Sequence, residues 1–298
     1  MAPKDLPDGI AILDFGGQYC HLIARRVREM NVYSEILHSD ATRADIEALG
    51  SEMNLKGIIF SGSPSSVKAA DGLRLDPEIL EIGVPVLGLC YGLQLLASMH
   101  GGKVEKAREY GVTQAYIDKS FGILEGMDAC AQVWMSHGDT VFEAPEGWTP
   151  VAHTDRAPVA AMVHEEKQIW GLQWHPEVNH TEHGMELLRN FFLNVCEAEA
   201  HWRPLDAIEE AVNSSRNIEG DGQAIIALSG GMGRSVAEAL APRAVGVWLL
   251  AVIVDPSASS KTFRSSNTGL VKRVPMRRLA TGTGSNSSRG CSVLSMIP

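Results

Sequence analysis

The most informative segment of the sequence reads Val84-Pro-Val-Leu-Gly-Leu-Cys90-Tyr-Gly-Leu-Gln94. Its short apolar run, Val86–Leu89, predicts a parallel strand, because strands buried on both faces are continuously apolar. The strand pattern stops at Cys90, and Leu93–Met99 then predicts a helix. A cysteine therefore stands at an abrupt change from strand to helix.

The spacing Gly88-x-Cys90-x-Gly92 matches a nucleophile elbow with sulfur in place of a hydroxyl group. Flanking glycines suit such a turn because it leaves no room for Cβ atoms and can require a positive φ. The turn would aim the thiol at the start of a helix, whose amide groups stabilise a thiolate. The same pattern also fits a buried cysteine beside a glycine turn, so the assignment depends on residues elsewhere in the chain.

Length and composition indicate an ordinary globular protein. The chain has 298 residues, 45% of them hydrophobic and 21% charged, which predicts about two domains. Its net charge of −10 argues against a general nucleic-acid binder. Neither a membrane-spanning helix nor a signal peptide is expected, because long apolar runs are missing. Scattered cysteines without a C-x-x-C pair favour a reducing cytoplasm over disulfides or a zinc site.

The N-terminal part of the chain alternates between predicted strands and helices. The expected strands are Ile10–Asp14, Val32–Leu37 and Gly57–Phe60, and the expected helices begin at Cys20, Thr42 and Pro77. This alternation predicts an α/β fold with a mostly parallel, doubly wound, flavodoxin-like sheet and helices on both faces. Sites in such sheets lie beyond the carboxyl ends of the strands. Asp14–Tyr19, Ser61–Ser66 and Cys90 should therefore share a cleft.

The middle of the chain has a different pattern. From Lys103 to Gln173 we expect short β segments and turns, with Trp134–Asp139 as a polar loop. Gln168–Trp174 predicts a further strand, which places His175-Pro-Glu177 at its end. Glu182–Glu197 then predicts an amphipathic helix.

His175 is the best candidate for the base that a nucleophilic cysteine requires, because it directly follows a buried strand. Glu177 can accept a hydrogen bond from the second ring nitrogen and fix the tautomer. A His-x-Glu pair also occurs incidentally. His180 and His183 lie close by in the sequence, but without a cysteine partner a solvated loop is favoured and no metal site is expected.

A cysteine activated in this way is suited to acyl transfer. The thiolate would attack a carbonyl group, and the N–H groups of Tyr91 and of the turn around Ser63 would meet the oxyanion. Gln94 lies one helical turn beyond the cysteine and could hold an amide substrate, or be an ordinary surface glutamine. Backbone groups of Ser136 and His137 could bind the α-amino and α-carboxylate ends of that substrate.

The motifs Gly88-Leu-Cys90-Tyr-Gly92 and Gln173-Trp-His175-Pro-Glu177 resemble a class I glutamine amidotransferase. Further motifs resemble the amidotransferase half of the glutamine-hydrolysing GMP synthetases, and these are Ile12–Tyr19, Leu22–Val27, Trp134–Asp139 and His175–Thr181. The resemblance implies glutamine as substrate and a cysteine, histidine and glutamate as nucleophile, base and orienting group. It implies no cofactor for glutamine hydrolysis.

The resemblance also bears on the remaining site residues. It implies Cys90, His175 and Glu177 as the catalytic triad. At Ser63 the family has a glycine whose N–H belongs to the oxyanion hole, and serine keeps that N–H. Glutamine binding is assigned here to Gln94, Ser136 and His137.

The sequence from Gly220 to Gly231 resembles the opening of an ATP pyrophosphatase domain, whose loop binds pyrophosphate through backbone amides. The resemblance implies ATP contacts at Ser229, Gly230, Gly231 and Ser235. ATP, Mg²⁺ and XMP are implied for the family's synthetase step. Here Met232, Gly233 and Arg234 replace the loop's Val, Asp and Ser, which removes an acidic residue suited to the magnesium-nucleotide site.

Three segments are expected. They are an amidotransferase domain at 8–200, a partial ATP pyrophosphatase domain at 204–256, and a disordered, basic, Ser- and Gly-rich tail at 257–298. All 36 acidic residues lie before Pro256, so the tail is either genuine or the product of a shifted reading frame.

Three functions stay open at this point. The first is glutamine hydrolysis for GMP synthesis, with a doubtful synthetase step in this chain or with a separate synthetase chain. The second is a non-catalytic glutamine-binding or regulatory relative. The third is the glutaminase component of another amidotransferase. Neither nucleic acid nor a membrane is expected as a partner.

Overall fold

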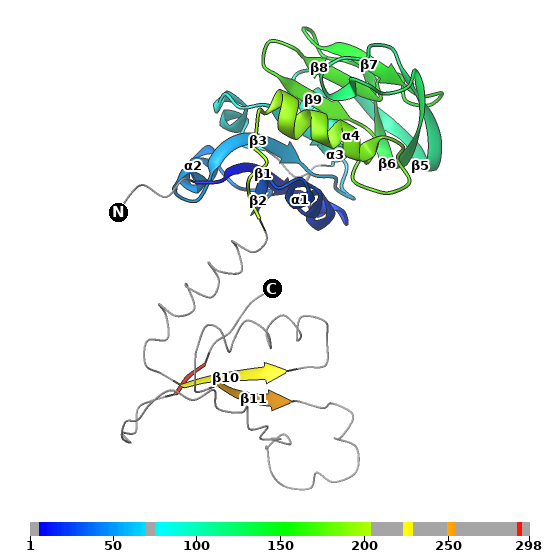
Figure 1. Cartoon of the computed structure of the whole chain (residues 1–298). Coiled ribbons are helices and arrows are strands. Elements are labelled where there is room, and N and C mark those ends of the chain that lie inside the picture. Colours follow the sequence, from blue (N-terminus) through cyan, green and yellow to red (C-terminus); the bar gives the residue numbers. More distant parts are fainter. Residues whose placement is uncertain (1–5, 70–74, 204–222, 229–248, 254–290, 294–298) are drawn as a thin grey trace, which may run out of the picture. The chain divides into compact units, whose positions relative to one another are not determined.

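The computed structural model describes residues 6–69, 75–203, 223–228, 249–253 and 291–293. The chain divides into two units, Met1–Arg203 and Pro204–Pro298, and each unit contains its own sheet (Figure 1). The predicted triad and the predicted oxyanion-hole and glutamine-binding residues all lie in the first unit.

The first unit is built on a nine-stranded sheet with the order β2-β1-β3-β4-β9-β8-β7-β5-β6. The strands are β1 (Asp8–Asp14), β2 (Tyr33–His38), β3 (Asn54–Phe60), β4 (Val86–Leu89), β5 (Lys103–Ile117), β6 (Cys130–Glu143), β7 (Thr149–His153), β8 (Ala161–His164) and β9 (Ile169–Leu172). The strands from β2 to β9 in this order pair in parallel, which confirms the predicted α/β class. The remaining strands pair antiparallel and extend the sheet at one end.

Helices cover both faces of the parallel strands, as predicted. They are α1 (Cys20–Glu29), α2 (Arg43–Ala48), α3 (Tyr91–Met99) and α4 (Gly184–Arg189), with 3₁₀ turns at Leu49–Ser51, Pro77–Glu81 and Gly122–Leu124 and a π-helix at Asn190–Val195. Alternate residues of a strand point to opposite faces of a sheet. Ile10 and Ile12 of β1 therefore pack in the cluster that contains α1 and α4, whereas Ala11 and Leu13 pack with α2 and α3.

Local side chains fix two of the helix ends. Thr42 and Asp45 form a capping box at the start of α2, since each side chain accepts a hydrogen bond from the other residue's N–H. The helix expected from Glu182 begins later, at Gly184, because His183 has a φ of 54° and lies outside it. It changes to a π-helix at Asn190, whose side-chain amide donates to two carbonyl groups near the Gly122–Leu124 turn.

The expectation of short β segments between Lys103 and Gln173 was wrong for β5 and β6, which are 15 and 14 residues long. A bulge between Lys106 and Glu109 and a positive φ at Gly111 interrupt the alternation by which a long strand would be read. The predicted polar loop Trp134–Asp139 was also wrong, because it lies inside β6. His137 and Asp139 are buried there and Ser136 is half-buried, so the segment is not solvated as a loop would be.

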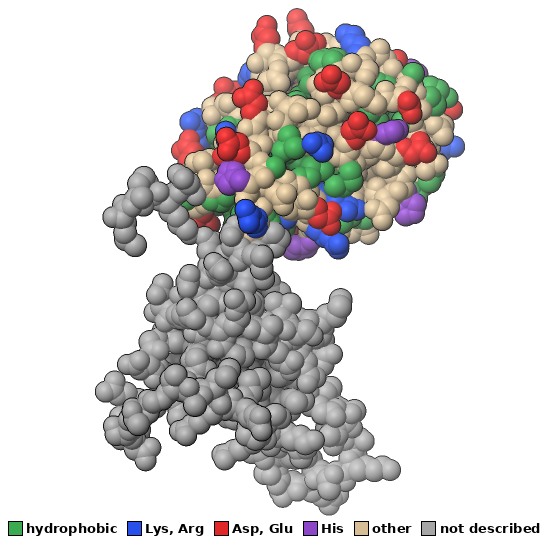
Figure 2. Space-filling model, in the orientation of Figure 1, with side chains coloured by type: hydrophobic (Ala, Val, Ile, Leu, Met, Phe, Trp, Pro, Cys, Tyr) green, Lys and Arg blue, Asp and Glu red, His purple; other side chains and the backbone are tan. Residues whose placement is uncertain are grey.

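Figure 2 shows one face of the first unit. Acidic and basic side chains are interspersed over this face, with smaller apolar areas between them. No helix in the described part of the chain is long and apolar enough to cross a membrane.

The second unit contains three described strands, β10 (Gln223–Leu228), β11 (Leu249–Ile253) and β12 (Cys291–Val293), in the order β11-β10-β12. Both pairs are parallel. β10 and β11 fall on short apolar runs, a pattern that predicts buried strands. β12 lies in the segment expected to be a disordered tail, and the rest of that segment is outside the described residues.

Candidate active site

The turn at Cys90 has the geometry of a nucleophile elbow. Cys90 joins β4 to α3 with φ 53° and ψ −99°, a combination that few residues with a Cβ atom adopt. A Cβ on Gly88 would lie 2.6 Å from the Gly92 carbonyl carbon, and one on Gly92 would lie 2.6 Å from the Phe60 carbonyl oxygen. Both glycines are therefore needed for space, as predicted. The positive φ, in contrast, falls on the cysteine itself and on neither glycine.

Strands β4 and β9 bring Cys90 and His175 together. The strands pair in parallel with Leu89 opposite Leu172, and the Cys90 N–H donates to the Leu172 carbonyl group at 2.7 Å. Residues that follow neighbouring parallel strands meet at the same edge of the sheet. The two side chains accordingly border the same residue, Gly62, where an added Cβ would lie 3.2 Å from His175 Cε1 and 3.8 Å from the Cys90 Cβ.

His175 and Glu177 form a buried pair. Nδ1 of His175 lies 2.7 Å from Oε1 of Glu177, and the two side chains are 5% and 0% exposed. Burial alone would lower the pKa of His175, but the Glu177 carboxylate and the contact with Cys90 outweigh it and raise the pKa well above 6.5. The ring is therefore suited to hold the proton of the Cys90 thiol.

Two residues that the sequence reasoning did not single out hold the loop with the candidate base. Thr181 Oγ1 donates to the His175 carbonyl group at 2.6 Å, and Arg26 Nε donates to the Glu177 carbonyl group at 2.9 Å. The Arg26 guanidinium also donates to Asn179 Oδ1 at 2.8 Å. Arg26 and Thr181 both lie in motifs of the family resemblance. The spacing of those motifs, however, does not show that these two side chains bind backbone carbonyl groups.

The expected oxyanion-hole residues lie on two sides of Cys90. Tyr91 is the first residue of α3, directly after the cysteine. Ser63 follows Gly62, where an added Cβ would lie 3.8 Å from the Cys90 Cβ. Ser63 does not have a positive φ, so its backbone accommodates a side chain without the strain that would require glycine.

The expected glutamine-binding residues lie beside Cys90 on α3 and β6. Gln94 is 3% exposed, so it is not an ordinary surface glutamine, and its Nε2 donates to the Asp139 carbonyl group at 2.6 Å. The Cys90 thiol donates to the Ser136 carbonyl group at 3.6 Å. His137, the next residue of β6, is buried. Through the Ser136 carbonyl group, this segment of β6 forms a wall that faces the sulfur atom.

The profile of the class-I glutamine amidotransferase family matches residues 11–195. The chain belongs to this family. The GMP synthase (glutamine-hydrolyzing) of Clostridium tetani is 48% identical over 248 residues, which cover 83% of this chain and 48% of that protein. The enzyme of the same name from Clostridium perfringens is 47% identical over 250 residues, with the same shares covered, 83% and 48%.

Among solved structures, a Thermoplasma acidophilum protein described as one subunit of a GMP synthase matches this amidotransferase with a TM-score of 0.55 and 28% identity. The match covers 70% of this chain and 98% of that one. The amidotransferase spans about half the length of the curated relatives, 48% for both Clostridium proteins. Their remaining length has no counterpart in this match.

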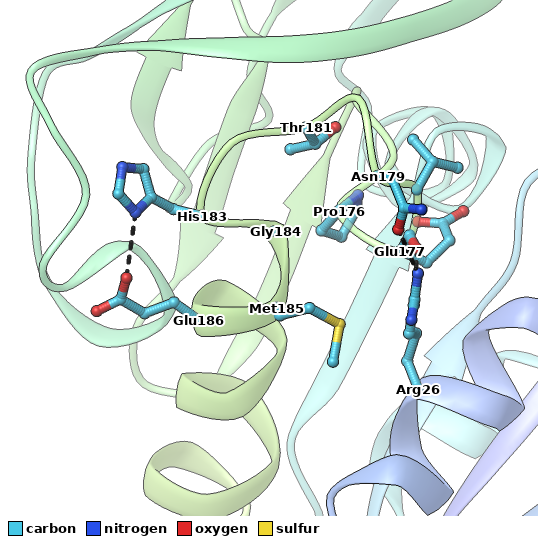
Figure 3. A pocket seen from close by; sticks show the side chains of 10 residues that line it. Arg26, Pro176, Glu177, Asn179, Thr181, His183, Gly184, Met185 and Glu186 are labelled. Carbon is cyan, nitrogen blue, oxygen red and sulfur yellow. Dashed lines mark hydrogen bonds and ion pairs between the residues drawn. The ribbon is translucent and has the colours of Figure 1, made fainter.

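A hollow of about 400 Å³ opens in the amidotransferase beside the loop that carries Glu177 (Figure 3). In Figure 3, His183 and Glu186 lie on one side of it and Arg26 and Asn179 on the other. Cys90 is not among the lining residues, which are Arg26, Pro176, Glu177, Val178, Asn179, Thr181, His183, Gly184, Met185 and Glu186. The hollow therefore adjoins the loop of the candidate base rather than the sulfur atom.

The expected nucleotide site of the amidotransferase chain cannot be placed. Its residues, Ser229, Gly230, Gly231 and Ser235, lie outside the residues that the structure describes. Within the described ranges, no group of three His, Cys, Asp or Glu side chains is arranged to hold a metal ion.

Proposed function

We propose that this amidotransferase hydrolyses glutamine to glutamate and ammonia through Cys90, His175 and Glu177. The observation that carries the proposal is that Cys90 and His175 both border Gly62, while His175 Nδ1 lies 2.7 Å from the Glu177 carboxylate. A nucleophile, a base and an orienting group in this order are the parts of a thiol acyl-transfer site.

The first half of the reaction forms a thioester. His175 takes the thiol proton, and the sulfur atom attacks the carbon of the glutamine side-chain amide. Negative charge develops on the amide oxygen, where the N–H groups of Tyr91 and Ser63 are the proposed donors. His175 then gives its proton to the nitrogen atom, the C–N bond breaks, and ammonia leaves a glutamyl thioester on Cys90.

The second half of the reaction consumes one water molecule. His175 removes a proton from the water as its oxygen attacks the thioester carbon, the C–S bond breaks, and the proton returns to the sulfur atom. Glutamate leaves and the thiol is restored. Thr181 and Arg26, which bind the backbone on either side of Pro176, keep the ring and the carboxylate aligned during both halves.

We further propose that the ammonia serves the amination of XMP to GMP. The names of the Clostridium relatives support this use. Because the chain spans 48% of their length, XMP, ATP and Mg²⁺ are assigned to a synthetase portion, in the second unit or on a separate chain. The Thermoplasma protein, named as one subunit of its synthase, supports a separate chain. A cytoplasmic location is proposed because Cys20, Cys90, Cys130 and Cys196 are free thiols.

Glutamate release from glutamine by the full chain tests the hydrolase proposal. The Cys90→Ala variant should lose the activity by about 10³-fold or more, since removal of a nucleophile leaves only binding and oxyanion contacts. Unchanged turnover in this variant would remove Cys90 from the mechanism.

A glutamine-like electrophile separates an enzyme from a non-catalytic relative. The diazoketone 6-diazo-5-oxo-norleucine alkylates a nucleophilic thiol that lies beside a bound glutamine side chain, and it releases nitrogen gas. We expect a covalent adduct on Cys90, located by mass spectrometry of the digested protein. An intact thiol after long incubation would support the glutamine-binding or regulatory relative instead.

A further inference from the structure

A buried acid–base pair lies behind the wall that faces the Cys90 thiol. Glu109 of β5 and His137 of β6 are directly opposite each other in the antiparallel ladder, and their side chains are 7% and 1% exposed. The bulge in β5 ends at Glu109 and turns this carboxylate inward. His137 Nε2 lies 3.6 Å from Glu109 Oε2.

The hydrogen bonds of His137 define where its protons are. Nδ1 lies 2.9 Å from the Asp139 carbonyl oxygen, which can only accept, so Nδ1 carries a proton. Nε2 is buried and has no hydrogen-bond partner among the described residues. The acidic group that faces Nε2 is the Glu109 carboxylate. A nitrogen lone pair facing a carboxylate is repulsive, so the two groups attract each other only when a proton lies between them.

The pair is connected to the candidate site through β6. Ser136, which precedes His137, offers its carbonyl group to the Cys90 thiol. The Asp139 carbonyl group accepts from His137 Nδ1 and also from Gln94 Nε2, which reaches Gln173 Oε1 at 3.3 Å as well. A change in the tilt of the His137 ring would therefore shift the backbone beside the sulfur atom.

Other contacts hold the pair in place. Thr154 Oγ1 donates to Glu109 Oε2 at 3.2 Å, and Thr140 Oγ1 lies 3.4 Å from His137 Nδ1. Burial lowers the pKa of His137, with Glu109 acting in the opposite direction and the nearby His175 acting with burial. These opposing effects meet at Nε2, the ring atom that faces the Glu109 carboxyl group.

We propose that Glu109 is a positioning residue of the glutamine site, whose buried carboxyl group faces His137 Nε2 and thereby fixes the Ser136–His137 backbone beside Cys90. This inference rests on the proposed function. Glu109 touches neither the sulfur atom nor the proposed substrate. Its effect is therefore exerted on the binding of the α-amino and α-carboxylate groups of glutamine. It should change affinity for a glutamine-like molecule more than the reactivity of the thiol.

Three variants of the full chain separate these effects. Glu109→Ala leaves Nε2 buried without a donor. Glu109→Gln supplies an amide N–H of nearly the same shape. Glu105→Gln, on the same strand but with a 46% exposed side chain, is the matched control. Each is treated with 6-diazo-5-oxo-norleucine over a range of concentrations, which yields the half-saturating concentration KI and the maximal alkylation rate. Iodoacetamide lacks the α-amino and α-carboxylate groups of glutamine, so its rate of alkylation reports thiol reactivity alone.

We expect Glu109→Ala to raise KI at least tenfold while its rate with iodoacetamide stays within threefold of the unmodified chain. Glu109→Gln should restore KI to within about threefold, and Glu105→Gln should match the unmodified chain. A KI for Glu109→Ala within twofold of the unmodified chain would overturn the proposal. Equal defects in the alanine and glutamine variants, or equal losses with both reagents, would also overturn it, because they indicate general structural damage.

The proposed function fails in a different way from this inference. If the diazoketone does not label Cys90 of the unmodified chain, the hydrolase proposal fails, and the positioning role that rests on it fails as well. If the diazoketone labels Cys90 and Glu109→Ala behaves like the unmodified chain, only the positioning role fails. Far-ultraviolet circular dichroism of each variant checks that the first unit is folded.

Discussion

Replacement of Cys90 by glycine should leave the first unit more stable than replacement by alanine, while either change abolishes glutamine hydrolysis. The residue has φ 53° and ψ −99°, a backbone conformation that glycine adopts readily and residues with a Cβ atom do not. Cys90→Ala is the matched control, because alanine also lacks the sulfur atom but keeps the Cβ. Any difference in stability between the two variants therefore reports the backbone strain at the elbow.

The magnitude follows from two opposing terms. A residue held in a sparsely populated region of φ and ψ costs on the order of 1–3 kcal/mol. Glycine is free of that strain but loses more conformational entropy on folding, by about 0.5–1 kcal/mol. The glycine variant should therefore exceed the alanine variant by about 1 kcal/mol. For a unit of this size, that corresponds to a rise in Tm of about 2–4 °C.

Tryptophan fluorescence during thermal or urea unfolding measures this difference. Five of the six tryptophans lie in the first unit, and they are Trp134, Trp148, Trp170, Trp174 and Trp202. Fluorescence therefore reports mainly the unit that contains the elbow. Equal stability of the glycine and alanine variants, or greater stability of alanine, would refute the inference that the elbow stores strain.

Three further predictions concern the same site. Gly92→Ala should destabilise the first unit by about 1–3 kcal/mol, because its Cβ would meet backbone atoms, whereas Gly50→Ala has open space and should change the urea midpoint little. The fold raises the pKa of His175, so the stability contributed by its protonated ring is complete below pH 6.5 and is lost as the pH rises through the higher folded pKa. Glu177→Gln removes the main raising influence and should shift the alkaline limb of the glutaminase pH profile to lower pH; an unshifted limb would contradict this role. Thr181→Val should cost about 1–3 kcal/mol in urea unfolding, because it leaves the buried His175 carbonyl group without its 2.6 Å donor, and wild-type stability would argue against that bond.

Much of the parallel half of the sheet could be predicted from local patterns. The apolar run before Cys90, the glycines around it and the strand before His175 are each contained within a few residues of sequence. The motifs around them were sufficient to identify the family, which the match over residues 11–195 confirms. Because parallel strands end at one edge, the prediction that Asp14–Tyr19, Ser61–Ser66 and Cys90 lie near one another also needed only strand order.

The antiparallel half and the support of the site depended on contacts between distant segments. β5 and β6 stabilise each other by pairing along their length. The bulge at Glu109 interrupts the alternation of apolar and polar residues, so the sequence pattern does not show one long strand. The polar residues of Trp134–Asp139 suggested a loop because a sequence does not show that a polar side chain has a buried partner. In the same way, the pairing of Arg26 with the Glu177 backbone joins α1 to a loop far along the chain.

The sequence by itself determined which chemical groups are present, which short segments form strands and helices, and which family they belong to. The tertiary structure decided that the positive φ falls on Cys90, that Gln94 is buried, and that Glu109 faces His137. The physical reason is the range of the interactions. Periodicity and turn geometry act between neighbours in sequence. Burial, backbone strain and the pairing of buried polar groups are set by groups that meet only when the sheet is assembled.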